Sequence, residues 1–356
     1  MQKKQLNFRS YYIILAVMLF VLMIVSARVG AVSLSYEKIF AFIGNAFGFD
    51  MKASYSKIEE QVFFQIRLPR VIECAFVGAA LSVSGALMQA LFRNPVVEPG
   101  LVGTSSGAAF GAAFVFVMGK NIAGSYADII GPFLLPLFAF AGGFLSTMAV
   151  YKISNIFGKT NVNTMILAGI AMNAIANGGT GFFSYISRDP QARSITFWNL
   201  GTLSGADWNG VMLTGFSTTI GIALCLRYTK DLNALLLGEE EAGHLGVHTE
   251  KLKRNVIILN TFIVAMATSL VGVISFVGLI VPHILRMLKS SDNRFLVIAS
   301  ALLGAILLNL TDMAARVLVA PSEFPIGIIT AFIGAPVFLY MLISNSRRQQ
   351  KGGFYA

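Results

Sequence analysis

Residues 78–112 read GAALSVSGALMQALFRNPVVEPGLVGTSSGAAFGA, and they give the first indication of how the chain folds. The segment belongs to two apolar runs, about 68–91 and 101–119, which a short stretch with two prolines connects. A helix needs about 20 apolar residues to cross the hydrocarbon core of a bilayer, and each run approaches that length. We therefore expect two transmembrane helices in this part of the chain.

Glycines within this segment recur at a helical spacing. Gly103, Gly107 and Gly111 are four residues apart, and small residues occupy most positions between them. The preceding run repeats the theme with Gly78, two alanines and Gly85. Small residues on one helix face let backbones approach closely inside a membrane. The spacing therefore predicts tight packing in a compact bundle of many helices rather than a wide pore.

The length criterion identifies ten apolar stretches in the whole chain. They are approximately 11–32, 68–91, 101–119, 129–151, 163–184, 210–227, 256–275, 276–288, 295–319 and 326–344. The first is interpreted as a retained span, because its apolar run is long for a signal peptide and Arg28 follows it. The eighth is short and contains Pro282, so neighbouring helices must satisfy the freed carbonyl. We expect an all-α polytopic membrane protein with a single domain over residues 1–356.

Composition supports the membrane assignment and excludes several classes of protein. Apolar residues make up 56% of the chain and charged residues 12%, and the mean hydropathy is +0.72. A soluble domain carries about 25% charged residues, because its surface must be hydrated. A soluble enzyme, a nucleic-acid-binding module and a disordered chain are therefore excluded. Most Lys and Arg residues fall in cytoplasmic segments when both termini are cytoplasmic, as the positive-inside rule requires.

One soluble segment on each side is longer than a turn. Residues 33–66 form an external loop that mixes charges with phenylalanines, and we expect an amphipathic hairpin at the membrane interface. Residues 228–255 lie on the cytoplasmic side and carry most of the cytoplasmic acids.

The cytoplasmic segment is expected to contain two short helices. One is Asp231–Leu237, with its first residue as N-cap and Gly238 at its end. The other is Glu239–His244, with acids in its first turn and Gly246 at its end. We expect the leucines of these helices to face outwards and form a docking surface for a cytosolic partner: Leu232, Leu235, Leu236, Leu237 and Leu245.

Ionisable side chains inside the spans are few. Glu73 and Asp312 are the acids that fall clearly within a span, and His283 is the histidine there. A proton- or sodium-coupled carrier usually needs carboxylates or histidines near the midplane, so a secondary transporter is disfavoured, although Glu73 keeps that alternative open. His283 has no acidic or histidine partner nearby in the sequence, so we interpret it as bonded within the bundle and expect no metal site.

The residues also argue against catalysis by this chain. It has no G-x-x-x-x-G-K-[ST] motif to hold a phosphate, so we do not expect it to hydrolyse ATP. A polytopic membrane enzyme, the remaining alternative, needs clustered acids or histidines at a membrane face. The acids Glu239–Glu241 have only His244 beside them. Cys74 and Cys225 lie in apolar runs and form no disulfide framework.

Several motifs together resemble one family of membrane proteins. They are RLPR at 67–70, the segment 78–112, FWNLGTLSGADW at 197–208, LGEEEAGHLGV at 237–247, GVISFVGLIVPHILR at 272–286 and PSEFPIGIITAFIGAPVFLYML at 321–342. In sequence and order they are similar to the permease subunit of type II ABC importers, which take up ferric siderophores, heme and cobalamin. The first 66 residues share with that family only one span and an external loop.

This resemblance implies an architecture and a set of partners. The expected assembly is a homodimer of ten-span subunits in the bacterial cytoplasmic (inner) membrane, in contact with lipid but not nucleic acid. Two ATPase subunits would bind on the cytoplasmic side and one substrate-binding protein outside. ATP and Mg would sit on the ATPase, so no cofactor is expected on this chain. An inverted repeat is also implied, in which 68–184 mirrors 256–344 and NPVVEPGLVG stands opposite FVGLIVPHI.

The resemblance implies that the substrate is an iron chelate, and heme ranks first among the candidate substrates. EPGLVGTSSGAAFGA and QARSITFWNLGTLSGADW are similar to the corresponding segments of heme permeases. Siderophore permeases are the second alternative. Cobalamin permeases share the EPGL pattern but usually differ around the FW pair, and they rank third.

The resemblance further implies roles for four groups of residues. Coupling to the ATPase is expected at Leu237, Gly238, Glu239, Glu240, Ala242, Gly243, Leu245 and Gly246. The binding protein would dock its carboxylates on Arg67, Arg70 and Arg316, for which contact with lipid phosphates is the alternative. The path would be lined by Asn173, Asn177, Gly178, Gly179 and Ser184, unless these residues only pack helices. The cytoplasmic gate would lie at Asn94, Val96, Val162, Asn163 and Thr164.

Overall fold

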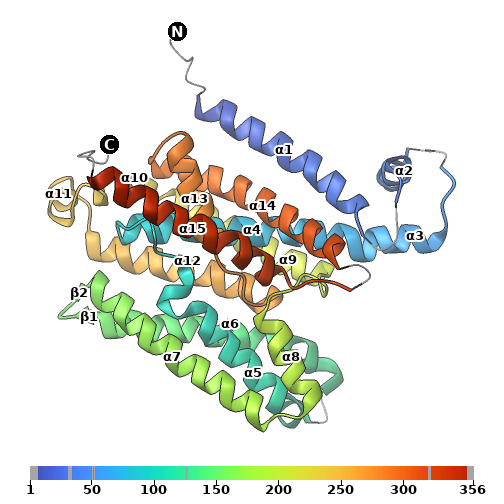
Figure 1. Cartoon of the computed structure of the whole chain (residues 1–356), viewed down its shortest axis with the longest axis horizontal. Coiled ribbons are helices and arrows are strands. Elements are labelled where there is room, and N and C mark those ends of the chain that lie inside the picture. The colour runs from blue at the N-terminus through green and yellow to red at the C-terminus, as the bar shows by residue number, and fades with distance from the viewer. Residues whose placement is uncertain are drawn as a thin grey trace.

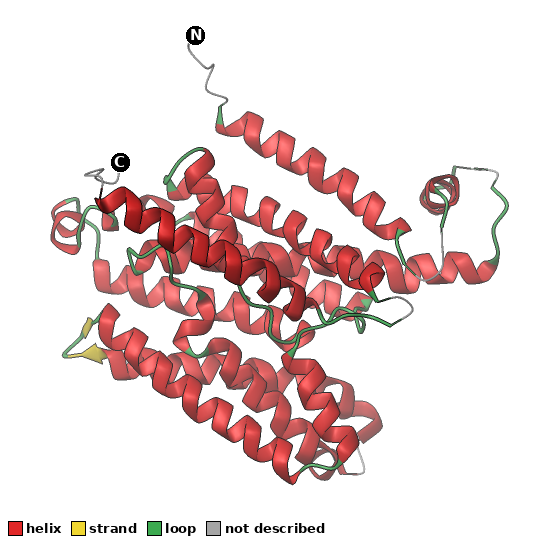
Figure 2. Cartoon of the chain, viewed as in Figure 1, coloured by secondary structure: helices red, strands yellow, loops and turns green. Residues whose placement is uncertain are grey.

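The computed structural model describes residues 7–30, 34–49, 51, 53–124, 127–319 and 322–350, and most of them are helical (Figures 1 and 2). The helices on the ten expected spans are α1 (Phe8–Arg28), α4 (Leu68–Leu91), α5 (Thr104–Ala123), α6 (Ala127–Ser154), α7 (Val162–Ile186), α9 (Trp208–Leu226), α12 (Thr249–Val271), α13 (Val277–Leu288), α14 (Asn293–Leu318) and α15 (Ile326–Gln350). The shorter elements are α2 (Tyr36–Ala46), α3 (Lys57–Val62), the π-helix Phe63–Arg67, the 3-10 helix Pro99–Val102, strands β1 (Asn155–Ile156) and β2 (Lys159–Thr160), α8 (Asp189–Asn199), α10 (Thr229–Leu235) and α11 (Glu239–His244).

Each expected span therefore coincides with a helix, and the expected all-α fold is confirmed. Seven helices in the described ranges are long and apolar enough to cross a membrane, and α13 and the first part of α15 are apolar but shorter. Pro282 of α13 is buried, as expected for a proline-containing segment that other helices surround.

α4 is the central helix of the bundle. Most of its residues are buried, and it packs against α9, α12, α13 and α14. The contact with α13 depends on Gly85, where a Cβ would lie 1.7 Å from the carbonyl oxygen of Gly278. α5 approaches α6 in the same way, because a Cβ on Gly111 would lie 2.1 Å from the carbonyl oxygen of Phe138. The glycines of the quoted segment thus serve helix packing, as predicted.

The two ends of the bundle carry different elements. The start of α1, the end of α15, α11 and the β1–β2 hairpin lie at one end, to the left in Figure 1, whereas α2 and α3 lie at the other. α2 has the expected amphipathic character, because Ile39 and Phe42 are buried and Phe40 is exposed. Residues 1–6 and 351–356 lie outside the described chain, so the cytoplasmic placement of both termini stays a prediction.

Candidate functional site

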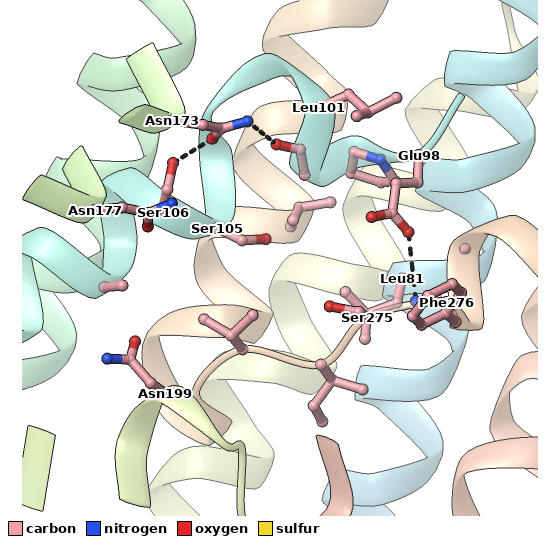
Figure 3. A pocket seen from close by; sticks show the side chains of 17 residues that line it. Leu81, Glu98, Leu101, Ser105, Ser106, Asn173, Asn177, Asn199, Ser275 and Phe276 are labelled. Atoms are coloured by element: carbon pink, nitrogen blue, oxygen red, sulfur yellow. Dashed lines mark hydrogen bonds between the residues drawn. The ribbon is translucent and has the colours of Figure 1, made fainter. Parts of the chain in front are cut away.

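A pocket of about 410 Å³ lies where α5 and α7 meet two segments that interrupt the α-helices of the bundle (Figure 3). One break precedes α5 and the other precedes α13. The pocket is lined by Leu81, Glu98, Pro99, Gly100, Leu101, Ser105, Ser106, Ala109, Asn173, Asn177, Asn199, Val264, Val273, Ile274, Ser275, Phe276 and Gly278. Among these residues Glu98 alone is ionisable, and the other polar side chains are hydroxyls and amides. Such a wall offers hydrogen bonds with little fixed charge.

Asn173 and Asn177, both predicted to line the path, reach this pocket from α7. The side-chain amide of Asn173 donates to the carbonyl oxygen of Gly100 over 3.1 Å, and its Oδ1 accepts a hydrogen bond from the hydroxyl of Ser106 (Figure 3). Asn177 is exposed. The two asparagines therefore differ, because the first holds α5 and α7 together and the second is open to a ligand.

Cysteine substitution tests this difference. We expect Asn177→Cys to react with a water-soluble maleimide about 10-fold faster than Asn173→Cys, because a thiol reacts according to its exposure. The two native cysteines, Cys74 and Cys225, are buried, so background labelling is low. Equal rates at both positions would contradict the described geometry, and no labelling at either position in any nucleotide state would remove these residues from the path.

The other predicted path residues lie farther along α7, outside the lining of this pocket. Gly179 is at a helix contact, because a Cβ there would lie 2.4 Å from the ring of Phe110. Gly178 faces open space, and Ser184 is half-buried. Their contact with a substrate stays a prediction.

Glu98 connects the two breaks in the bundle. Its Oε2 accepts a hydrogen bond from the backbone N–H of Phe276 over 3.4 Å (Figure 3). Phe276 is the N-cap of α13 and has a φ of 68°, which is uncommon for a residue with a large side chain. A carboxylate at a helix N-terminus also meets the partial positive charge of the helix. The contact joins NPVVEPGLVG to FVGLIVPHI, the segments that the family resemblance sets opposite each other.

A second pocket, of about 540 Å³, lies at the end of the bundle that carries α11. It is lined by Phe92, Arg93, Ile156, Lys159, Thr160, Asn161, Val162, Asn163, Glu239 and Glu250. Val162 and Asn163 belong to the predicted gate and begin α7, whereas Glu239 belongs to the predicted coupling surface and begins α11. The structure therefore brings two of the predicted groups around one cavity.

The remaining gate residues form local turns. The N–H of Thr164 donates to Oδ1 of Asn161, the N-cap of α7, over 3.0 Å. The N–H of Val96 donates to Oδ1 of Asn94 over 3.1 Å. These bonds fix the ends of the adjoining segments, and the gating role of these residues stays a prediction.

The second of the two predicted short helices occupies the predicted residues, and the first does not. α11 spans Glu239–His244, and Gly246 follows it with a φ of 85°. α10 spans Thr229–Leu235 with Tyr228 as its N-cap, so the predicted start at Asp231 is wrong. The helix begins earlier because α9 ends at Leu226 and the chain turns directly into α10.

The predicted leucine surface is exposed only in part. Leu236, Leu237 and Leu245 are exposed, whereas Leu232 and Leu235 are buried. The buried pair lies three residues apart on one face of α10, and α10 packs against α14, so the outward orientation predicted for them is wrong. In the predicted coupling group, Leu237, Glu240, Gly243, Leu245 and Gly246 are exposed, Glu239 is half-buried, and Gly238 and Ala242 are buried.

The three arginines predicted to dock a binding protein are buried. Arg67, Arg70 and Arg316 expose only 5%, 5% and 7% of their surface. Arg70 donates to Asp312 Oδ1 through Nε and Nη2, over 3.0 and 2.8 Å, and to Glu323 Oε1 through Nη1, over 2.7 Å. Nε of Arg316 lies 3.0 Å from Asp312 Oδ2. We call these five residues the outer charge cluster. The buried carboxylate of Asp312 holds Arg70 and Arg316 inside the protein.

The outer charge cluster also holds α1. Arg67 donates to the carbonyl oxygens of Ala27, over 3.3 Å, and Val29. Arg316 donates to the carbonyl oxygens of Ser26, over 3.0 Å, and Val29, and to the hydroxyl of Ser26 over 2.6 Å. The last carbonyls of a helix have no partner within it, and these arginines satisfy them. The cluster therefore binds α1 to α4 and α14, and docking of a binding protein on it stays a prediction.

In the described ranges no three His, Cys, Asp or Glu side chains gather closely enough to hold a metal ion. Glu73 is buried at the contact between α4 and α9, where a Cβ on Gly210 would lie 2.8 Å from its Oε1. His283 is half-buried on α13. Neither side chain lines one of the two pockets described above.

Comparison with known proteins decides the family, since the FecCD transport family matches residues 18–344. The chain belongs to the FecCD transport family. The hemin transport system permease protein HmuU of Yersinia pestis is 36% identical over 342 residues, which cover 95% of this chain and 96% of that protein. The cobalamin import system permease protein BtuC of Halobacterium salinarum is 40% identical over 277 residues, which cover 78% and 72%.

A solved structure extends the comparison to the fold. It is described as an inward-facing conformation of a metal-chelate type ABC transporter, and it matches with a TM-score of 0.79 at 29% identity, covering 94% of this chain and 99% of that one. This FecCD family member therefore has the type II ABC importer permease fold and is a multi-pass membrane protein, as the sequence motifs implied.

Proposed function

We propose that this FecCD family member is the permease through which an ATP-driven importer moves an iron chelate into the cytoplasm. Heme is the first candidate for that chelate. The observation that carries the proposal is the pocket of about 410 Å³ at the junction of two broken helical segments. In membrane transporters, irregular backbone at membrane depth is tolerated where it lines a cavity, and such breaks mark binding sites. A wall of amides and hydroxyls suits a large ligand that must bind and then leave.

The heme assignment draws on the relatives, because the pocket does not discriminate among the candidate substrates. A hemin permease matches nearly the full length of the chain, and a cobalamin permease matches a shorter part with higher identity. Ferric siderophores and cobalamin are therefore the alternatives. The nearly uncharged pocket lining is compatible with all three chelates, so transport must discriminate among them.

A second copy would complete the path. Asn177 is exposed in a single subunit, and so is Ile170, which lies seven residues earlier on the same face of α7. Lipid would cover the apolar groups but would leave the amide without a partner. A second α7 across a two-fold axis would enclose this face as a path. Two ATPase subunits at α10 and α11 would supply ATP and Mg, and one binding protein would deliver substrate from outside.

Uptake into proteoliposomes tests the function. The chain is reconstituted with its ATPase and binding protein, and hemin, a ferric hydroxamate and cyanocobalamin are offered separately. We expect ATP-dependent uptake of hemin. ATP-dependent uptake of only one of the other two would replace heme with that substrate. Uptake driven by a proton or sodium gradient, with no ATPase co-purifying, would instead show that the protein is a secondary transporter.

A further inference from the structure

Lys253 of α12 is a buried cation at the end of the bundle that carries α11. It exposes 2% of its surface. Its Nζ donates to Oε2 of Glu239 over 2.7 Å, to Oε1 of Glu250 over 2.9 Å and to the carbonyl oxygen of Thr160 over 3.1 Å. A lysine ammonium has three donors, so all of them have partners here. Lys253 was not among the residues to which the sequence assigned a role.

The three partners of Lys253 join separate elements of the chain. Glu239 is the first residue of α11, and Thr160 ends β2 just before the N-cap of α7. Glu250, in the first turn of α12, completes the link, because its Oε2 accepts from the N–H of Thr160 over 2.8 Å. Thr160 is therefore held through both its N–H and its carbonyl. In Figure 1 the start of α12 lies between α11 and the β1–β2 hairpin.

We propose that Lys253 is a positioning residue that couples α11 to the start of α7, so that displacement of α11 by an ATPase changes the width of the second pocket. The inference rests on the proposed function, because it requires an ATPase at α11. Charge-assisted bonds to a buried ammonium are short and directional, so α11 cannot shift without moving Thr160 or breaking the link. Asn163 and Glu239 lie on the walls of the same pocket, which therefore responds to both elements.

Replacement of Lys253 by methionine is expected to leave the chain folded. The side chains of Glu239 and Glu250 keep 38% and 33% of their surface exposed, so water can hydrate both carboxylates after the ammonium is removed. Methionine also preserves most of the buried aliphatic volume. Lys253→Met therefore removes the link while it retains the packing, and Lys253→Arg retains a cation that can restore part of it.

The experiment uses the full complex of this chain with its ATPase in lipid nanodiscs. Asn163→Cys is the reporter, because Asn163 is exposed at the second pocket and both native cysteines are buried. The maleimide labelling rate is measured without nucleotide and with ATP and vanadate. We expect the rate to change about 5-fold between these states in the parent, and less than about 1.5-fold in Lys253→Met. Glu239→Gln should reduce the response in the same way.

Lys38→Met is the matched control. It removes an ion pair of 2.6 Å between Lys38 and Glu59, which belong to α2 and α3 at the opposite end of the bundle, and it should leave the response to nucleotide unchanged. Lys253→Arg should recover more of the response than Lys253→Met.

Three results would overturn the inference. In the first, Lys253→Met keeps the full response to nucleotide. In the second, Lys253→Met and Lys253→Arg lose ATPase binding or thermal stability to the same extent, and this equal loss would show that Lys253 has a purely structural role. The parent complex could also hydrolyse ATP without any change in labelling at position 163, and then the proposed function would stand while this inference fails. If no ATPase binds the parent chain, the proposed function itself fails and the inference falls with it.

Discussion

Replacing Gly238 with valine is expected to lower substrate uptake per ATP hydrolysed by about 10-fold. Gly238 joins α10 to α11 with φ 138° and ψ 158°. That backbone region is almost restricted to glycine, and another residue there costs about 1–3 kcal/mol. A Cβ at this position would also lie 1.9 Å from Oε2 of Glu241. The strain is relieved when α11 rotates, which moves the surface proposed to contact the ATPase.

Uptake and hydrolysis measured together in proteoliposomes check this result, because their ratio reports coupling and not expression. Gly205→Val is the matched control, since Gly205 has open space around it and needs no positive φ. We expect its ratio to equal that of the parent. A normal ratio in Gly238→Val would show that α11 tolerates displacement, and it would contradict the proposed rigid contact.

Hydropathy predicts the helices of this protein well, because a bilayer imposes both a length and an apolar composition on each span. It predicts the short helices α10 and α11 less well. Leu232 and Leu235 are as apolar as the exposed Leu236 and Leu237, and only the packing of α10 against α14 decides which pair is buried. The orientation of a short helix therefore depends on contacts that lie far away in the sequence.

Buried charges were harder to predict, because their partners are distant in the chain. Arg70 and Asp312 are 242 residues apart, and nothing near either residue indicates their pairing. Lys253 stands close to Lys251 and Arg254 in a charged stretch, and the fold alone selects it for burial. Glu98 does carry a sequence signal, since an acid in an otherwise apolar segment is unusual.

The outer charge cluster should contribute strongly to the free energy of unfolding. Asp312→Asn is expected to lower the free energy of unfolding by about 3–5 kcal/mol, because removing one partner of a buried ion pair leaves the other charges uncompensated. Asp312 is fully buried and contacts two arginines, whereas Glu323 keeps 41% of its side chain exposed. Glu323→Gln should therefore cost at most about 1 kcal/mol. Thermal unfolding of the purified chain in detergent measures both changes.

Arg70→Glu separates a structural cluster from a docking surface. If the cluster is structural, a second carboxylate placed against Asp312 repels it inside the protein, and the variant should unfold at a much lower temperature than Glu323→Gln. If Arg70 docks a binding protein, Arg70→Glu should leave the temperature of thermal unfolding unchanged and should slow the association of the binding protein. The difference in association rate between the variant and the parent should then become smaller as the salt concentration rises. Unchanged thermal stability in both Arg70→Glu and Asp312→Asn would contradict the cluster described above. We expect the structural outcome, because burial leaves these arginines little surface to offer a partner in the described conformation.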